Sequence, residues 1–259
     1  MTQDKLAARL GLALALLLAA RTTAFAEAPG SDPKAVAVAD QVMTTLGGQK
    51  AWEATHWIHF RFAGFRNHWW DKWTGRHRVE FINQKGEHWL ILENLNTREG
   101  RAWKDGKELA GEEAKQVVSR GYATWINDTY WLLAPYKLRD PGVTLTLDGE
   151  ETLNGQGYDK LHLSFEGVGL TPGDQYWMWV NKSNHLVDRW AYKLQDFKPD
   201  QQPVAWDWKE WQRFGSILLS PTRYNPAENK SILLDHIEVD QPMADTVFTS
   251  AEAMVDAQK

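Results

Sequence analysis

The sequence predicts an α+β fold, a strongly curved antiparallel sheet (half-open β-barrel) of about eleven strands, with helices covering its concave face. From residue 55 onward, apolar and polar residues largely alternate, and pairs such as Lys85-Gly86 and Asp105-Gly106 separate the alternating runs. This pattern is typical of antiparallel hairpins. So broad a sheet must curl or split. Because the expected helices are too few to cover both faces of a flat sheet, one curled sheet with a concave face is favoured.

Two amphipathic segments are expected to form helices. The first begins at Ser31-Asp32-Pro33, where a capping side chain precedes a proline at the first helical position. Apolar residues then recur at helical spacing until Gly47-Gly48, which supplies the stop signal. A second helix is expected over Gly111–Tyr122.

Strands are expected over most of the remaining chain. The first follows Thr55, where Ile58, Phe60 and Phe62 share one face. The other expected strands are Trp69–Trp73, Arg76–Ile82, His88–Glu93, Arg101–Lys104, Val143–Leu147, Tyr158–Phe165, Gln175–Val180, Leu186–Leu194, Val204–Trp211, Ser216–Thr222 and Ile232–Val239.

One segment, Trp125–Gly142, interrupts the strands with a dense group of aromatic and aliphatic residues. Asn127 or Asp128 is expected to cap a short helix, because a short side-chain oxygen accepts the first free backbone N–H groups. Pro135 is expected to end this helix. So apolar a segment must bury itself against the sheet, where it either fills a core or closes a cavity.

The N-terminus has the pattern of a secretory signal. Lys5 and Arg9 precede an apolar run that is too short to anchor the chain in a bilayer, and Ala24-Phe25-Ala26 fits a cleavage site. We therefore expect Met1–Ala26 to be cleaved and residues 27–259 to form one half-barrel domain, periplasmic or secreted, with no stable membrane anchor. The chain has no cysteine, so it is expected to be neither a lipoprotein nor disulfide-bonded.

Composition and motifs argue against several classes of function. With a formal net charge of −5 and no basic runs, the chain is a poor candidate for binding nucleic acid. His56 and His59 lie three residues apart, which places them on opposite faces of a strand, so no metal site is expected. No P-loop, dinucleotide or G-x-S-x-G pattern is present, and no cofactor is expected.

Tryptophan is unusually frequent, with 15 residues against nine phenylalanines and seven tyrosines. Trp177 and Trp179 share one face of their expected strand, and Trp190 shares a face with Tyr192, opposite Arg189. Aromatic residues dominate cores, so these rings are expected either to fill a large core or to line a concave wall.

The order of elements resembles the periplasmic lipoprotein-carrier and lipoprotein-receptor superfamily, the outer-membrane lipoprotein-sorting fold. The resemblance rests on the first helix, the meander around Arg101–Lys107, the mid-chain helical segment and Phe248-Thr249 after the last strand. Trp125–Gly142 together with Gly167–Trp177 is more closely similar to an uncharacterised group of secreted bacterial proteins with that fold. The resemblance implies a half-open barrel whose concave face holds acyl chains or another apolar ligand.

The function expected from these observations is non-catalytic binding or carriage of a hydrophobic small molecule or lipid in the cell envelope. An envelope protein is a second candidate partner. Two alternatives stay open: an envelope hydrolase or lyase with Asp128, Asp174 and a histidine as acid and base, and a scaffold that binds proteins through exposed aromatic residues. The residues expected to bind the ligand are Trp125, Asp128, Tyr130, Trp131, Trp177, Trp179, Arg189 and Trp190.

Overall fold

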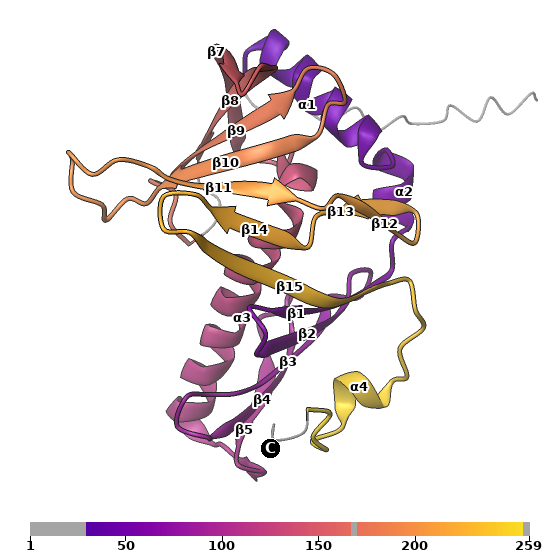
Figure 1. Cartoon of the computed structure of the whole chain (residues 1–259). Helices are drawn as coiled ribbons and strands as arrows, with labels where there is room; N and C mark the ends of the chain where they lie inside the picture. Colours follow the sequence, from indigo (N-terminus) through magenta and orange to yellow (C-terminus); the bar gives the residue numbers. More distant parts are fainter. Residues whose placement is uncertain (1–29, 167–169, 256–259) are drawn as a thin grey trace, which may run out of the picture.

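The computed structural model describes residues 30–166 and 170–255, which form an open antiparallel sheet with its longer helices along one face (Figure 1). The predictions made for Met1–Ala26 lie outside these residues. The strands are β1 (Trp57–Phe62), β2 (Arg66–Asp71), β3 (Arg76–Ile82), β4 (His88–Asn94), β5 (Gly100–Lys104), β6 (Lys107–Glu108), β7 (Val143–Leu153), β8 (Gln156–Phe165), β9 (Gln175–Asn181), β10 (Val187–Lys193), β11 (Val204–Lys209), β12 (Gln212–Phe214), β13 (Ile217–Leu219), β14 (Thr222–Asn225) and β15 (Lys230–Val239).

The large sheet has 13 strands in the order β6-β5-β4-β3-β2-β1-β15-β14-β11-β10-β9-β8-β7, and β12 and β13 form a separate hairpin. The predicted fold class is therefore confirmed, with more strands than the eleven or so expected. The expected strand Ser216–Thr222 is divided between β13 and β14, which lie in different sheets. The last strand, β15, pairs with β1 on one side and with β14 on the other, and so joins the first strands to the rest of the sheet.

The helices are α1 (Pro33–Thr45), α2 (Gln49–Ala54), α3 (Gly111–Leu133), the 3-10 helix η1 (Ala134–Lys137) and α4 (Thr246–Thr249). At the start of α1, Asp32 accepts a hydrogen bond of 2.8 Å from the backbone N–H of Lys34, as a capping residue does. No helix of the described residues is long and apolar enough to cross a membrane.

The central helix corrects the sequence prediction. Two helices separated near Asn127 were expected, but α3 is one continuous helix of 23 residues. Asn127 and Asp128 lie within its last two turns and do not cap it. An aspartate inside a helix usually competes for backbone hydrogen bonds, but here the Asp128 side chain is buried and paired with residues of β2. The α-helix ends at Leu133, two residues before Pro135.

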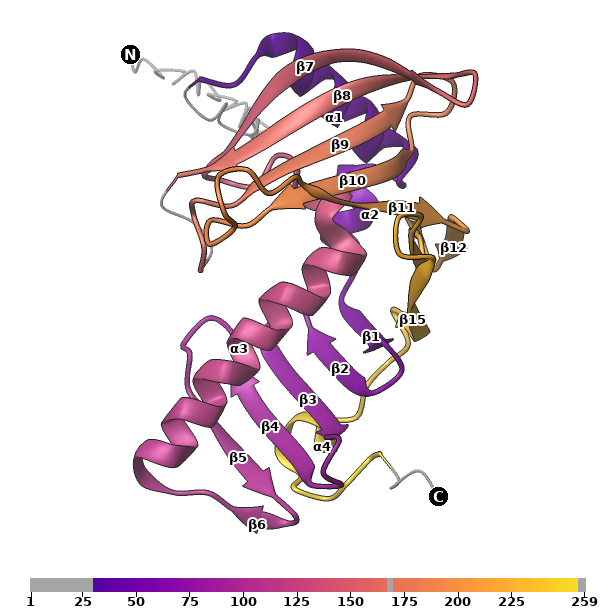
Figure 2. The ribbon, with the colours of Figure 1, turned by 60° about the vertical axis from the view of Figure 1, so that its left-hand side comes forward.

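The helix α3 crosses the inner face of the sheet, defined here as the face that α1 and α3 cover (Figure 2). Its first turns pack on β4 and β5, and its last turns, with α1 and η1, lie over β7–β11. We call β1–β6 the N-terminal half of the sheet and β7–β11 with β14 the C-terminal half. The main core joins α1, η1 and the end of α3 to the C-terminal half.

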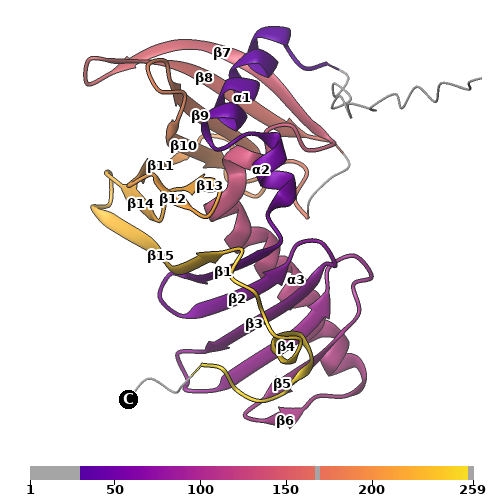
Figure 3. The same cartoon turned by 90° about the vertical axis from the view of Figure 1, so that its right-hand side faces the viewer.

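The C-terminal segment lies on the other face of the N-terminal half, where α4 contacts β3 and β4 (Figure 3). Arg78 and Glu80 are fully buried there and form an ion pair of 2.5 Å. Arg78 donates to backbone carbonyls of the segment, and Glu80 accepts from its backbone N–H groups. Because every charged atom involved has a partner, the pair holds the end of the chain against the sheet.

Candidate ligand cavity

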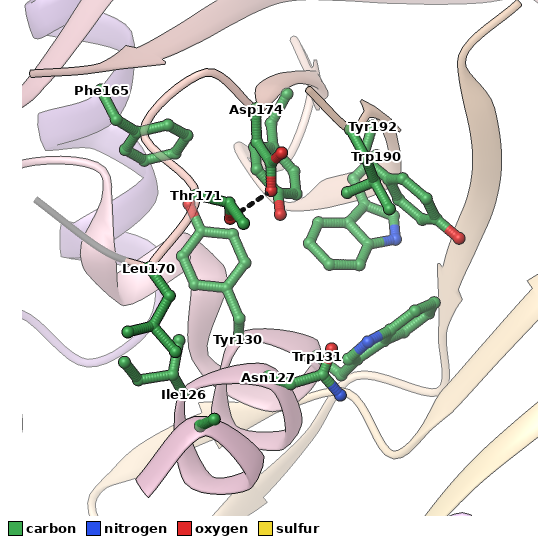
Figure 4. A pocket seen from close by; sticks show the side chains of 13 residues that line it. Ile126, Asn127, Tyr130, Trp131, Phe165, Leu170, Thr171, Asp174, Trp190 and Tyr192 are labelled. Atoms are coloured by element: carbon green, nitrogen blue, oxygen red, sulfur yellow. Dashed lines mark hydrogen bonds between the residues drawn. The ribbon is translucent and has the colours of Figure 1, made fainter. Parts of the chain in front are cut away.

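A cavity of about 380 Å³ lies between the last turns of α3 and the inner face of β8–β10 (Figure 4). The helix contributes one wall, the strands contribute the facing wall, and the loop between β8 and β9 borders a third side. The lining residues are Ala123, Ile126, Asn127, Tyr130, Trp131, Phe165, Leu170, Thr171, Asp174, Tyr176, Trp190, Tyr192 and Leu194.

Aromatic rings from α3 and two adjacent strands form a continuous wall of this cavity. Tyr176 on β9 and Trp190 on β10 have ring centroids 5.6 Å apart. Tyr130 packs against both, at 5.1 Å and 5.9 Å. Trp131 meets Trp190 edge-on at 5.0 Å with an interplanar angle of 75°. Tilted and edge-on pairs of this kind are favourable, so the rings support one another in place.

The mainly apolar wall also carries polar side chains, among them Asp174, Tyr176 and Tyr130. The Asp174 carboxylate is 5% exposed and accepts hydrogen bonds from the Thr171 hydroxyl at 2.6 Å and the Gln195 backbone N–H at 2.8 Å. Burial, together with the negative charge of Asp174, raises the pKa of Tyr176. Burial likewise raises the pKa of Tyr130 well above its usual value, and its hydroxyl is buried without a hydrogen-bond partner among the described residues. Both phenols therefore stay protonated and able to donate.

Three of the residues predicted to bind a ligand lie in the cavity wall, namely Tyr130, Trp131 and Trp190. Trp190 and Tyr192 share the inner face of β10, as their spacing predicted. That these residues bind a ligand stays a prediction.

Trp177 and Trp179 lie on the opposite face of the sheet, which corrects their predicted place in the concave wall. On β9 it is Tyr176 and Met178 that point to the inner face. Trp179 instead packs with residues of the outer face and donates a hydrogen bond of 2.7 Å to Glu151. The alternation was correctly assigned, but both faces of β9 carry aromatic rings, so alternation alone did not identify the lining face.

Arg189 also lies on the outer face and does not anchor a ligand in this cavity. Its Nε donates to Asp207 on β11 at 2.7 Å, and both residues border a different, polar depression on that side. The strand alternation that turns Trp190 inward turns its neighbour outward.

Trp125 and Asp128 are on α3 but outside the cavity lining. The Trp125 ring packs edge-on against Trp70 at 5.2 Å, and it lies 6.5 Å from the His77 ring. Asp128 is 0% exposed and accepts two hydrogen bonds of 2.6 Å from Arg66. Both residues therefore belong to the contact between α3 and the N-terminal half of the sheet.

A chain of buried ionisable side chains continues from Asp128 under α3. His68 Nε2 lies 2.8 Å from Asp128, His68 Nδ1 lies 3.0 Å from His77 Nε2, and His77 Nδ1 lies 3.0 Å from Glu93 Oε1. Burial lowers the pKa of His68 to about 4, although the hydrogen bond to Asp128 opposes this shift. We call these residues, together with Arg66, the buried polar chain.

Sequence reasoning missed the buried polar chain, although part of its signal is present. His77 and Val79 occupy alternate positions of β3, so a histidine stands on a face that is otherwise apolar. Glu93 stands in the same way two residues after Ile91 on β4. Polar residues on an apolar face are expected to have hydrogen-bond partners, because burying an unpaired polar group costs free energy. Which partners they find depends on strand pairing.

The cavity does not bring together Asp128, Asp174 and a histidine, the acid and base set expected for a hydrolase or lyase. Among the described lining residues Asp174 is the only carboxylate, and none is a histidine. Asp128 and His68 do meet, but both are fully buried away from the cavity. Nor does any group of three or more His, Asp or Glu within residues 30–166 and 170–255 have the arrangement to hold a metal ion.

Comparison with known proteins finds similar solved structures but no match by sequence. Neither a protein-family model nor a curated protein matches the chain. A DUF1329 family protein from Desulfovibrio piger is 14% identical, with 84% of this chain and 98% of that chain covered and a TM-score of 0.46. A putative outer membrane lipoprotein-sorting protein domain from Vibrio parahaemolyticus is 9% identical, with 83% and 96% covered and a TM-score of 0.43.

A LolA superfamily protein from Nitrosomonas europaea is 10% identical, with 83% of this chain and 97% of that chain covered and a TM-score of 0.42. The similar structures thus include the lipoprotein-sorting superfamily that the order of elements in the sequence resembles.

Proposed function

We propose that this chain is an exported binding or carrier protein that holds a hydrophobic, lipid or acyl-bearing ligand in the cell envelope and catalyses no reaction on it. The observation that supports this proposal is the cavity beneath α3, whose volume of about 380 Å³ falls in the range of small-molecule sites. Its walls are mainly aromatic and aliphatic, so an apolar ligand that enters them leaves water at a favourable free energy.

The ionisable residues of the cavity lining also agree with a carrier role. The described lining residues include one carboxylate and no histidine, so they do not supply the Asp and His pair expected for a hydrolase or lyase. The scaffold alternative draws little support from the surface, because Trp73, at 60% exposure, is the only tryptophan among the exposed large hydrophobic residues of the described chain.

The ligand can be sought directly. The protein purified under native conditions from its own host is extracted with organic solvent, and the extract is examined by mass spectrometry for a stoichiometric lipid. In parallel, a neutral fluorescent acyl probe is titrated into the delipidated protein. The proposal predicts a co-purifying lipid and saturable binding of the probe. If neither is found, the proposal fails.

Filling the cavity gives a matched test. Ala123→Phe places a ring in the cavity, whereas Ala205→Phe adds the same ring on the outer face of β11. Each costs about 1–3 kcal/mol of stability through overpacking. We expect only Ala123→Phe to weaken probe binding, so equal losses of binding in both variants would count against this cavity.

Export from the cytoplasm is tested separately by the N-terminus of the mature protein. Cell fractionation followed by N-terminal sequencing should find the chain outside the cytoplasm, beginning at Glu27. A chain that keeps Met1 would contradict the proposed signal cleavage.

A further inference from the structure

The charge on the described residues that line the cavity is negative only. Asp174 is the only carboxylic acid among the described residues that line the cavity, and no lysine, arginine or histidine is among them. The carboxylate is 5% exposed, and among the described residues no cation pairs with it. Its donors are neutral: the Thr171 hydroxyl, the Gln195 backbone N–H and the hydroxyl of Tyr176.

A buried carboxylate with neutral donors alone still favours a positive charge nearby. Burial removes water that would otherwise solvate the charge, and buried carboxylates are usually paired for this reason. A carboxylate has about four acceptor positions, and the Asp174 oxygens meet three donors, the Thr171 hydroxyl, the Gln195 backbone N–H and the Tyr176 hydroxyl. Acceptor capacity therefore remains at the wall of the cavity.

The aromatic rings of the cavity wall also favour a positively charged ligand. The faces of Tyr and Trp rings are electronegative and attract a cation that lies within about 6 Å of the ring centroid. Tyr176 contributes such a ring, because it lines the cavity together with Asp174 and its hydroxyl interacts with that carboxylate, and Tyr130 and Trp190 pack around it. In Figure 4 the Asp174 and Thr171 side chains lie at the end of the cavity opposite the helix residues Ile126 and Asn127.

We propose that the cavity selects amphiphiles with a positively charged nitrogen, a protonated amine or quaternary ammonium, which lies near Asp174 and the Tyr176 ring while the hydrocarbon part follows the aromatic wall. This inference rests on the proposed carrier function and deepens it by naming the class of ligand. A free fatty acid is disfavoured, because its carboxylate would meet Asp174 with no cation lining the cavity to compensate.

The simpler interpretation of Asp174 is that it only stabilises the loop before β9. Asp174 accepts from Thr171 within a tight turn and also ties this turn to Gln195. A turn role requires an acceptor oxygen, which Asn also supplies, whereas selection of a cation requires the negative charge. The substitution Asp174→Asn therefore separates the two roles.

The experiment compares three probes that share a ten-carbon chain: decyltrimethylammonium, 1-decanol and decanoate. Each displaces the neutral fluorescent probe from the delipidated protein at concentrations below micelle formation. For the wild-type chain we expect the tightest binding for the ammonium and the weakest for the carboxylate. Asp174→Asn should weaken decyltrimethylammonium binding by about tenfold and leave 1-decanol within about twofold.

Two further variants control this result. Asp188→Asn removes one negative charge from the outer face, where Asp188 accepts from Tyr158 and Asn181, and it should not change the order of the probes. Asp174→Glu keeps the charge and should retain preference for the ammonium. Thermal unfolding of each variant shows whether it is folded, and the wild-type order of the probes needs no variant at all.

The outcomes separate this inference from the function on which it rests. If the wild-type chain binds all three probes equally, or prefers decanoate, the inference is overturned while binding of a hydrophobic ligand stands. If no probe binds, both fail. A lysophospholipid with an ammonium head group distinguishes the source of the cation: its binding supports a membrane lipid, and binding of the alkylammonium alone supports a free amphiphilic amine.

Discussion

One helix covers both halves of the sheet, yet the two contacts are built from different chemistry. Between Gly121 and Asp128, α3 meets the buried polar chain of the N-terminal half, in which most polar atoms are hydrogen-bonded. Under its last turns, the C-terminal half presents aromatic rings and leaves a cavity. The difference indicates that the polar contact fixes the helix to the sheet, and that the aromatic contact leaves room for a ligand.

The hydrogen bonds of the polar contact depend on one another, because His68 must donate on one side and accept on the other. Asp128 is bound by Arg66, so His68 Nε2 donates to Asp128 and its Nδ1 accepts from His77 Nε2. One proton must then lie between His77 Nδ1 and Glu93 Oε1, 3.0 Å apart. Loss of any member leaves at least one neighbouring buried group with one partner fewer, whereas an aromatic ring loses contacts more gradually.

The largest effect is expected from Asp128→Asn, which removes the charge that Arg66 and His68 share. Breaking a fully buried ion pair from one side costs about 3–5 kcal/mol, and because the Arg66 side chain is 22% exposed we expect a loss near the lower end, about 3 kcal/mol. The matched change in the aromatic contact, Tyr130→Phe, removes a hydroxyl that has no partner among the described residues and should cost less than about 1 kcal/mol. Urea unfolding of both variants checks the contrast. Equal losses would mean that the two contacts do not differ as described.

The second largest effect is expected from low pH, which should destabilise the polar contact. The pKa of His68 falls from 6.5 to about 4 on folding, so the folded chain binds fewer protons between these values than the unfolded chain does. Stability is therefore complete above pH 6.5 and is lost as the pH falls toward 4, by about 3 kcal/mol in all. Burial would raise the pKa of Asp128, but hydrogen bonds from His68 and Arg66 outweigh it, and the lowered pKa adds acid sensitivity at lower pH.

Urea unfolding at several pH values measures this dependence. His68→Gln, whose amide can still donate to Asp128, should flatten the curve between pH 6.5 and 4. An unchanged slope in this variant would show that His68 does not titrate as stated. Trp179→Phe on the outer face serves as a control that leaves the slope as it is.

The same comparison shows which features sequence could predict. The fold class, the Asp32 cap and the alternation on β9 and β10 depend on neighbouring residues, and all were predicted correctly. Asp128 was predicted as a cap because capping is a local property. Its actual partner, Arg66, lies 62 residues away in the chain, and only the packing of α3 on the sheet brings them together.

The lining of the cavity was predicted in part for a related reason. Tyr130, Trp131 and Trp190 were chosen for their aromatic rings and do line it, whereas Trp177 and Trp179 were chosen for the same reason and do not. When both faces of a strand are aromatic, periodicity cannot tell the inner from the outer face. The curvature of the sheet decides, and that depends on all its strands.

A smaller effect is expected from Trp190→Phe in the aromatic wall. Trp190 is fully buried and contacts Tyr130, Trp131 and Tyr176, so a smaller ring leaves space that its neighbours fill only partly. We expect a loss of about 2 kcal/mol together with altered affinity for the acyl probe.

Trp179→Phe, which loses one hydrogen bond to Glu151, should cost about 1 kcal/mol and leave probe affinity unchanged. A change of probe affinity in Trp179→Phe alone would place the ligand on the outer face.

The smallest expected effect tests how closely α3 lies on the polar half. In an exposed helix, Gly121→Ala would stabilise by up to about 1 kcal/mol. Here an added Cβ would lie 3.0 Å from both Glu93 Oε1 and Ile91 Cγ2, so overpacking of about 1–3 kcal/mol opposes that gain. The net result should be a loss of about 1 kcal/mol by urea unfolding. A gain in stability would mean that the helix can move away from β4 without cost, and the polar contact would then be no tighter than the aromatic one.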